Sequence, residues 1–166
     1  EGLVGDFVMS RKEVGVIPGT RKPILELGTL EDDLMRRDFT VNSLCKDEDG
    51  KIIDLFEGVY DLKTRVLRTP LDPMITLLDD PLRMLRGLRF SITKGFIIDS
   101  ELWNSMLDPR VLDKLKEVVS HERMREEITK MMKHDTIKSL KLLNKIPGLM
   151  EVVFSNGMWL MPTTKK

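Results

Sequence analysis

The spacing of apolar and polar residues divides the chain into two stretches of different character. In the first 70 residues the apolar runs are short, and residues 3–10, 51–56 and 66–68 are predicted strands. From residue 82 onward apolar residues recur every three or four positions, as Leu82, Leu85 and Leu88 do, which is typical of helices packed on one side. The pattern predicts an α+β chain with mixed elements first and helices afterwards.

Capping residues and prolines mark where the helices of the second stretch begin. Pro81 suits the first turn of a helix because its missing N–H is not needed there, and the two aspartates before it suit the positive end of the helix dipole. Gly95 is a natural stop for that helix. The same signals predict further helices that begin near Asp99, Pro109, Ser120 and Thr136, and residues 149–154 are expected to pack back briefly after the last of them.

Glycines and prolines predict loops and turns in the first stretch. Residues 14–28 hold five of them and are predicted to form a mobile loop with at most one short strand. Thr29, followed by three acidic residues, predicts a short helix that leads into Arg36 and Arg37. A hairpin turn is expected at residues 47–50 and a short helix at residues 58–65, and the strand at residues 66–68 is expected to close this part.

Charge is balanced over the whole chain but not along it. The chain has 27 Lys or Arg and 27 Asp or Glu, so no overall field draws it to nucleic acid. Residues 71–166 carry 16 basic residues against 13 acidic ones, which makes this half the expected place for a phosphate-facing surface. The single cysteine, Cys45, excludes an internal disulfide, and no apolar run is long enough to span a membrane. We therefore expect a cytoplasmic protein without membrane contact.

Asp80 and Arg83 have the chemistry to recognise a nucleobase. They are three residues apart, a spacing that places two side chains on one helical face. A carboxylate accepts a hydrogen bond from an exocyclic amino group, and a guanidinium donates to a ring nitrogen or a carbonyl oxygen. Together they match the pairing edge of cytosine and of adenine. The alternative is a plain ion pair at the start of a helix, which this stretch alone favours.

Segments elsewhere in the chain favour base recognition by Asp80 and Arg83 over a plain ion pair. RRDFTVN at residues 36–42 is followed by GVYDL at residues 58–62, VLR at residues 66–68 and DDPLRMLR at residues 79–86. In this order and with these gaps the segments resemble the class II tRNA nucleotidyltransferases, the CCA-adding enzymes, and the related bacterial poly(A) polymerases. The resemblance covers residues 6–127. It implies the C-terminal part of a nucleotidyltransferase-type α/β head at residues 1–70, followed at residues 71–166 by an all-helical neck and body that selects the nucleobase and binds RNA.

The resemblance also implies a nucleotide-binding role for residues of both stretches. Arg37 is expected to bind the phosphates of the incoming nucleotide, and Asp38 and Asn42 its ribose. Asp80 and Arg83 are expected to bind its base. For Arg37 and Asp38 the alternative is an internal salt-bridge network.

Further charged residues are assigned to the same site or to its support. Arg86 and Arg89 are expected to bind the nucleotide through its phosphates or to form internal ion pairs. Asp79, Arg123 and Arg125 are expected to support the helix that carries Arg83, because similar residues in the family stabilise the turn beside it.

The residues that perform the chemical step are not found in this sequence. The reaction needs an Asp-x-Asp pair that holds Mg²⁺, and the family places that pair upstream of all the segments quoted above. The acids at residues 47–49 lie in a predicted turn, so we expect no metal ligands within the chain. Asp6 is an auxiliary carboxylate candidate, with a solvated strand residue as the alternative. Because the chain begins with Glu1, we expect a fragment whose missing N-terminal segment carries the catalytic strands and the Mg²⁺ ligands.

The resemblance implies an RNA nucleotidyltransferase that adds C and A from CTP and ATP to the 3′ end of tRNA and releases pyrophosphate. A poly(A) polymerase of the same family, a non-catalytic nucleotide- or RNA-binding module, and a helical interaction domain are the alternatives. A basic helical face is expected to follow the phosphates of the tRNA acceptor stem, with a merely solvated face as the alternative. Its residues are Lys130, Lys133, Lys138, Lys141 and Lys145.

Overall fold

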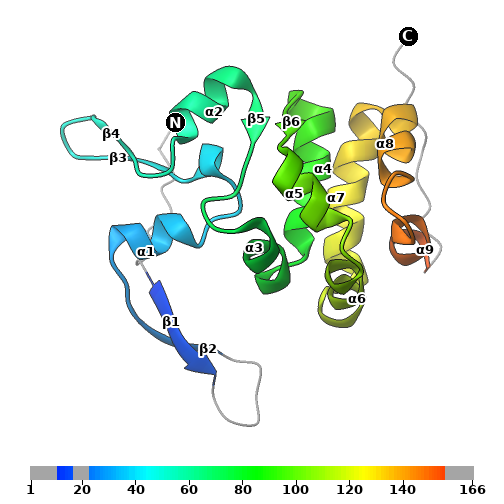
Figure 1. The fold of residues 1–166 in the computed structure, drawn as a ribbon, viewed down its shortest axis with the longest axis horizontal. Helices are drawn as coiled ribbons and strands as arrows, with labels where there is room; N and C mark the ends of the chain where they lie inside the picture. The colour runs from blue at the N-terminus through cyan, green and yellow to red at the C-terminus, as the bar shows by residue number, and fades with distance from the viewer. Residues whose placement is uncertain (1–10, 17–22, 156–166) are drawn as a thin grey trace, which may run out of the picture.

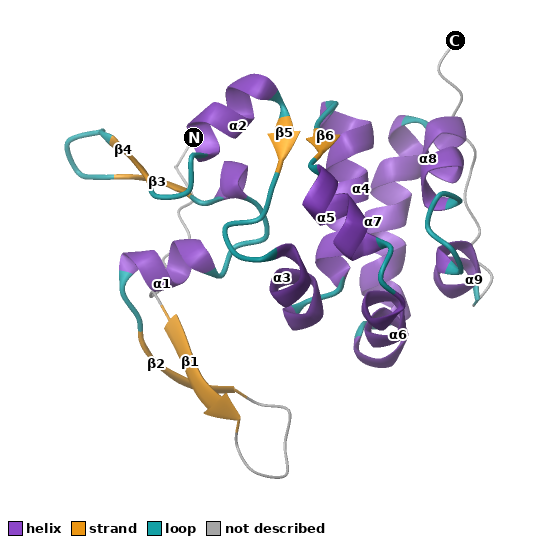
Figure 2. Ribbon diagram, in the orientation of Figure 1, coloured by secondary structure: helices purple, strands orange, loops and turns teal. Residues whose placement is uncertain are grey.

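The computed structural model describes residues 11–16 and 23–155 of the chain. Short strands and helices come first and a run of helices follows, in the order that the sequence predicts (Figure 1). The elements up to residue 67 are called the front part of the chain below. Figure 2 shows that the strands are confined to this part and to its border with the helices. The predicted strand at residues 3–10, including Asp6, lies outside the described residues.

A hairpin stands away from the rest of the described chain. Strand β1 (Arg11–Val16) pairs antiparallel with strand β2 (Pro23–Leu27), and the register shifts between Glu13 and Gly15 (Figure 1). The prediction of a loop with at most one short strand at residues 14–28 is therefore wrong. The glycines and prolines were interpreted as strand breakers, whereas a bulge accepts Gly15 and the first position of a strand accepts Pro23.

Helix α1 (Leu30–Met35) begins with a capping box, which confirms the predicted helix before Arg36. The Asp32 N–H donates to Thr29 Oγ1 over 3.1 Å, and the Thr29 N–H donates to the Asp32 carboxylate over 2.9 Å. The chain then leaves the helix and forms one 3-10 turn, η1 (Thr40–Asn42).

A second hairpin and a short helix complete the front part. Strands β3 (Leu44–Lys46) and β4 (Ile52–Asp54) pair antiparallel around the predicted turn, and helix α2 (Gly58–Thr64) follows. A Cβ atom on Gly58 would lie 2.2 Å from the carbonyl oxygen of Thr40, so only glycine allows α2 to approach η1 this closely.

The rest of the described chain is helical apart from one short strand. The predicted helices at residues 82–94 and beyond are confirmed within one or two residues at each end. The elements after strand β5 (Val66–Leu67) are α3 (Pro73–Asp79), α4 (Leu82–Lys94), β6 (Ile97–Ile98), α5 (Ser100–Met106), α6 (Pro109–Val118), α7 (His121–His134), α8 (Thr136–Leu143) and α9 (Leu149–Phe154).

Helix α3, strand β6 and helix α9 were not predicted. Helix α3 begins with Asp72, whose side chain accepts from the Ile75 N–H over 3.0 Å, and with Pro73 in its first turn. The prediction used Pro73 only as a boundary. Strand β5 pairs in parallel with β6 rather than within the front part, because Gly95 turns the chain back and the Ile97 N–H donates to the Arg65 carbonyl over 2.7 Å.

One apolar core runs through the described chain. Helix α4 lies against α7 at its centre, and Phe39 and Leu67 of the front part belong to the same cluster as Leu85 and Met106. A Cβ atom on Gly87 would stand 2.8 Å from Met106 Cε, so the glycine lets α4 pack closely. The division of the chain at residue 70 stays a prediction.

In the described part of the chain, no helix is both long and apolar enough to cross a membrane. The cytoplasmic location stays a prediction.

Candidate functional site

Asp38 lies between α1 and η1, and its buried carboxylate joins two segments of the chain. Its Oδ1 accepts from the Phe39 N–H and from Asn42 Nδ2, each over 2.9 Å. Its Oδ2 accepts from Arg86 Nε over 2.7 Å and lies 2.6 Å from an Arg86 terminal nitrogen. A carboxylate offers about four acceptor positions, and these four contacts occupy them. The Asp38 side chain is therefore fully bonded, as a residue with only 8% of its surface exposed needs to be.

Arg37 lies on the outer side of the same turn. Its guanidinium donates to the Asn42 carbonyl over 2.8 Å and forms an ion pair with Asp33 over 3.0 Å. The side chain is 43% exposed, so it keeps donors that face solvent. The structure thus brings Arg37, Asp38 and Asn42 together without placing them on one helical face, because the chain turns at η1.

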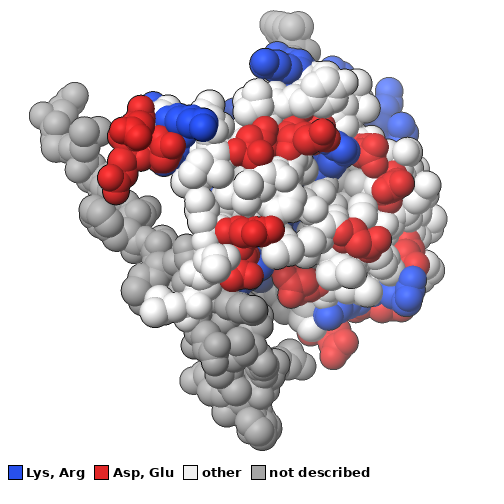
Figure 3. Space-filling model, turned by 60° about the vertical axis from the view of Figure 1, so that its left-hand side comes forward, with Lys and Arg blue, Asp and Glu red and all other residues white. Residues whose placement is uncertain are grey.

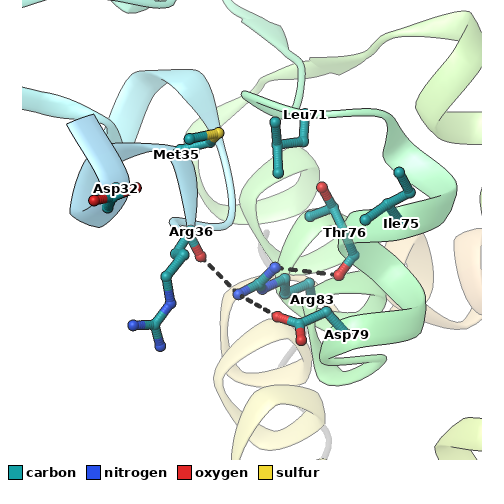
Figure 4. A pocket seen from close by; sticks show the side chains of 8 residues that line it. All are labelled: Asp32, Met35, Arg36, Leu71, Ile75, Thr76, Asp79 and Arg83. Carbon is teal, nitrogen blue, oxygen red and sulfur yellow. Dashed lines mark hydrogen bonds and ion pairs between the residues drawn. The ribbon is translucent and has the colours of Figure 1, made fainter. Parts of the chain in front are cut away.

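Arg83 connects this turn to α3 and α4. Its guanidinium donates to the carbonyl of Arg36 over 2.7 Å and to that of Thr76 over 3.2 Å, and it forms an ion pair with Asp79 over 3.3 Å. Figure 4 shows these contacts at the wall of a cavity of about 290 Å³. The cavity is lined by Asp32, Met35, Arg36, Leu71, Ile75, Thr76, Asp79 and Arg83.

Asp80 lies between two helices rather than on the face of one. Its backbone is extended, with φ −134° and ψ 97°, and α4 starts after it, so the helical-face argument for Asp80 and Arg83 does not hold. Its carboxylate accepts from the Leu82 N–H over 3.1 Å and from Arg123 over 3.2 Å. Asp80 and Arg83 therefore have different partners, and their assignment to the nucleobase stays a prediction.

Arg89 of α4 contacts α7 rather than the turn at η1. Its Nε donates to Glu127 of α7 over 2.5 Å, and its guanidinium lies 4.4 Å from the centre of the Phe90 ring. Both members of the ion pair are largely buried, so Arg89 ties α4 to α7. Arg125 is exposed on α7.

A buried network behind η1 was not assigned from the sequence. Asp61 is 1% exposed and accepts from Thr40 Oγ1 over 2.6 Å and from Arg68 Nε over 2.9 Å. The hydrogen bond from Arg68 to Asp61 is the main reason that the pKa of Arg68 is raised. The signal was present, because Asp61 and Arg68 belong to the GVYDL and VLR segments that carry the family resemblance.

The Asp54 carboxylate accepts hydrogen bonds from N–H groups at the start of α2, from Gly58 over 2.8 Å and from Val59 over 2.9 Å. Burial raises the pKa of Asp54, but hydrogen bonds from the N–H groups of Val59, Gly58 and neighbouring residues outweigh it, so the pKa lies below its ordinary value. Across residues 11–16 and 23–155 no group of three or more His, Cys, Asp or Glu side chains is arranged to hold a metal ion. The expected Mg²⁺ therefore has no ligand set among the described residues.

Comparison with known proteins decides the family. The family model for the poly A polymerase head domain matches residues 6–68. A tRNA nucleotidyltransferase of Schizosaccharomyces pombe, cca2, is 43% identical over 141 residues, which are 83% of this chain and 29% of that protein. The CCA-adding enzyme of Streptococcus gordonii is 41% identical over 104 residues, which are 63% of this chain and 25% of that enzyme.

The chain belongs to the tRNA nucleotidyltransferase and poly(A) polymerase family. The structure of the Bacillus stearothermophilus CCA-adding enzyme in complex with CTP matches 75% of this chain and 33% of its own, with a TM-score of 0.66 and 32% identity. The Thermotoga maritima CCA-adding enzyme complexed with tRNA matches 79% of this chain and 32% of its own, with a TM-score of 0.68 and 27% identity. These likenesses confirm the predicted fold class, part of a nucleotidyltransferase head followed by helices.

The chain spans less than a third of the length of these family members. Family membership therefore describes this segment, and the activity of the whole protein is a separate question.

Proposed function

We propose that this chain is the nucleotide-selecting part of an RNA nucleotidyltransferase that adds C and A from CTP and ATP to the 3′ end of tRNA, with release of pyrophosphate. One observation carries the proposal. Arg83, from the segment that resembles the base-reading motif of the family, bonds to Arg36, from the segment that resembles its sugar- and phosphate-binding motif, at the wall of one cavity (Figure 4). Family members of the same fold bind CTP and tRNA.

Each part of the nucleotide has a proposed partner. Arg37, whose guanidinium is partly exposed, binds the phosphates. Asp38 and Asn42 form the ribose site, in which the Asn42 amide contacts the sugar and Asp38 holds that amide in place. Asp80 accepts a hydrogen bond from the amino group of C or A, and Arg83 donates one to the ring nitrogen beside that group. Asp80 can exchange its present partner at small cost, because the Arg123 side chain is 53% exposed and an ion pair of that kind contributes only about 0 to 1 kcal/mol.

The described residues bind and orient the nucleotide but do not carry the chemical step. We assign Mg²⁺ to carboxylates outside the described residues, where it would stabilise charge on the phosphates. Asp6 also lies outside them and keeps its proposed auxiliary role.

The tRNA acceptor stem is proposed to lie along α7 and α8. Acidic side chains are prominent on the face that Figure 3 shows, which makes that face a poor surface for a polyanion. The lysines of α7, α8 and the segment after α8 are exposed, and two of them sit beside acids, Lys130 next to Glu126 and Lys138 next to Asp135. Contact with phosphates here carries little sequence information and weakens with salt.

A poly(A) polymerase is the second candidate, since the matching family model describes a poly A polymerase head domain. Such an enzyme needs to accept adenine only, whereas CCA addition needs cytosine as well. Equilibrium binding of CTP, ATP, GTP and UTP to the chain separates them. We expect CTP and ATP to bind more tightly than GTP and UTP. Selective binding of ATP alone would favour the poly(A) polymerase, and no preference among the four would contradict both.

A further inference from the structure

Arg86 differs from the other arginines of α4 in forming its ion pair with the segment proposed to bind the ribose. Arg83 donates to main-chain carbonyls and Arg89 to a carboxylate of the neighbouring helix α7. Arg86 instead reaches a carboxylate 48 residues earlier in the chain, in the segment proposed to bind the ribose. Two of its nitrogens lie 2.6 and 2.7 Å from the same oxygen of Asp38.

Asp38 connects Arg86 to Asn42 through its two carboxylate oxygens. One oxygen of its carboxylate lies against Arg86 and the other accepts from Asn42 Nδ2 over 2.9 Å. Because the amide nitrogen of Asn42 faces Asp38, its side-chain oxygen faces the other way. The carbonyl of Asn42 accepts from Arg37 over 2.8 Å, so the series of bonds runs from α4 to the proposed phosphate-binding arginine.

We propose that Arg86 is the positioning residue for sugar selection: by fixing the carboxylate of Asp38, it sets the orientation of the Asn42 amide against the ribose. This inference rests on the proposed function and deepens it, because it assigns the choice between ribose and deoxyribose to a residue on the helix that carries the base-selecting arginine. Arg86 itself contacts neither sugar nor phosphate in this assignment.

From the geometry we expect that lysine does not replace Arg86. A guanidinium presents several donors in a rigid plane, whereas an ammonium is a point charge on a flexible stem. Arg86→Lys keeps the charge that balances buried Asp38 but loses the paired contact that holds the carboxylate in one orientation. Base selection is expected to stay, because the side chains of Asp80 and Arg83 bond to neither Asp38 nor Asn42 among the described contacts.

Arg68→Lys is a matched control. Arg68 and Arg86 have similar exposure, 38% and 35%, and each binds an aspartate that is 1% and 9% exposed, respectively. Arg68→Lys therefore weakens a comparable ion pair in the same part of the fold. In that pair Asp61 bonds to Thr40 and Arg68 to Glu57, and neither bonds to the side chain of Asn42. Both variants are expected to lower the melting temperature.

The test measures equilibrium binding of CTP and dCTP to the parent chain, Arg86→Lys, Arg68→Lys and Asp38→Asn. We expect the preference for CTP over dCTP to fall about three- to tenfold in Arg86→Lys, the range that one hydrogen bond contributes, and to stay at the parent value in Arg68→Lys. The ratio of CTP to UTP affinity is expected to stay unchanged in both.

Asp38→Asn provides a second route to the same result if Arg86→Lys does not fold. It is expected to lose the same sugar preference, and the double variant to lose no more, because both residues act through one contact. An unchanged CTP to dCTP ratio in folded Arg86→Lys would overturn the inference while leaving the proposed function intact. An unchanged ratio in folded Asp38→Asn would overturn the inference and also contradict the assignment of Asp38 to the ribose site. A parent chain that binds neither nucleotide would overturn the proposed function, and the inference with it.

Discussion

The guanidinium of Arg83 donates to the main-chain carbonyl of Arg36 over 2.7 Å, and this bond joins two segments that are 47 residues apart. Arg86, one turn further along α4, joins the same two segments through Asp38. Two contacts from one helix fix its position against the turn at η1. Arg83 also lines the adjacent cavity, so these contacts hold it in a set arrangement with the turn that carries Asp38 and Asn42.

Asp80→Ala tests base selection. Removing the acceptor for the amino group of C or A is expected to lower the ratio of CTP to UTP affinity by about five- to a hundredfold, since an unpaired buried group costs about 1 to 3 kcal/mol. The measurement is equilibrium binding of all four nucleotides together with the melting temperature.

Asp108→Ala is the control for Asp80→Ala. Asp108 also accepts from an N–H at a helix start, that of Arg110 over 2.9 Å, and also pairs with an arginine, over 2.7 Å, but it lies at the start of α6. Asp108→Ala therefore removes the same two kinds of contact at a helix start that is not assigned to the nucleotide. If the two variants lose melting temperature equally and the ratio of CTP to UTP affinity is unchanged in each, Asp80 only supports the helix start.

Arg37→Ala tests phosphate binding. Because phosphates are common to all the nucleotides, we expect weaker binding of CTP and ATP by the same factor, with their ratio nearly unchanged. Stability should change little, since the pair with Asp33 is exposed and contributes about 0.5 kcal/mol or less. Asp33→Ala breaks the same pair but keeps the cation, so its nucleotide binding should not weaken. A changed ratio of CTP to ATP in Arg37→Ala would contradict this role.

Gly58→Ala tests the close approach of α2 to η1. The new Cβ would stand 2.2 Å from the Thr40 carbonyl oxygen, which cannot move aside as a side chain can, so we expect a loss of about 1 to 3 kcal/mol or more in the free energy of unfolding by urea. Gly95→Ala is the comparison, because the added atom has space there, 3.6 Å from Arg65, and meets only the strain of φ +72°. That strain costs about 1 to 2 kcal/mol. A smaller effect at Gly58 than at Gly95 would be inconsistent with the packing described.

Asp108 predicts how stability depends on pH. Its hydrogen bond from the Arg110 side chain and the bond from the Arg110 N–H lower its pKa from 3.8 to about 2. A group whose pKa is lower in the folded chain contributes stability above its unfolded pKa and loses it as the pH falls through the folded pKa. The melting temperature of the parent chain should therefore exceed that of Asp108→Asn at pH 5, and the difference should shrink between pH 4 and pH 2. A constant difference over this range would contradict the ion pair.

The helices of the second half could be predicted because their signals are local. Each is marked by a capping aspartate, serine or proline within a few residues of its start, and its apolar side repeats at helical spacing. The same signal was present at Asp72 and Pro73, where it was interpreted as a boundary. Hairpin β1–β2 was missed for a similar reason, since glycine and proline mark both loops and the irregular positions of strands.

The family resemblance, the order of mixed elements followed by helices, and the charged residues around the proposed site could all be predicted from the amino-acid sequence. The partners of those charged residues were known only once the chain was folded. Arg83, Arg86 and Arg89 recur every three residues and are chemically alike in the sequence, yet they bind the Arg36 carbonyl, Asp38 and Glu127. Successive positions at that spacing drift around a helix, so each arginine meets whichever segment packs against its side. Those segments come from residues about 40 to 50 positions away in either direction, a distance over which spacing along the chain carries no information about contact.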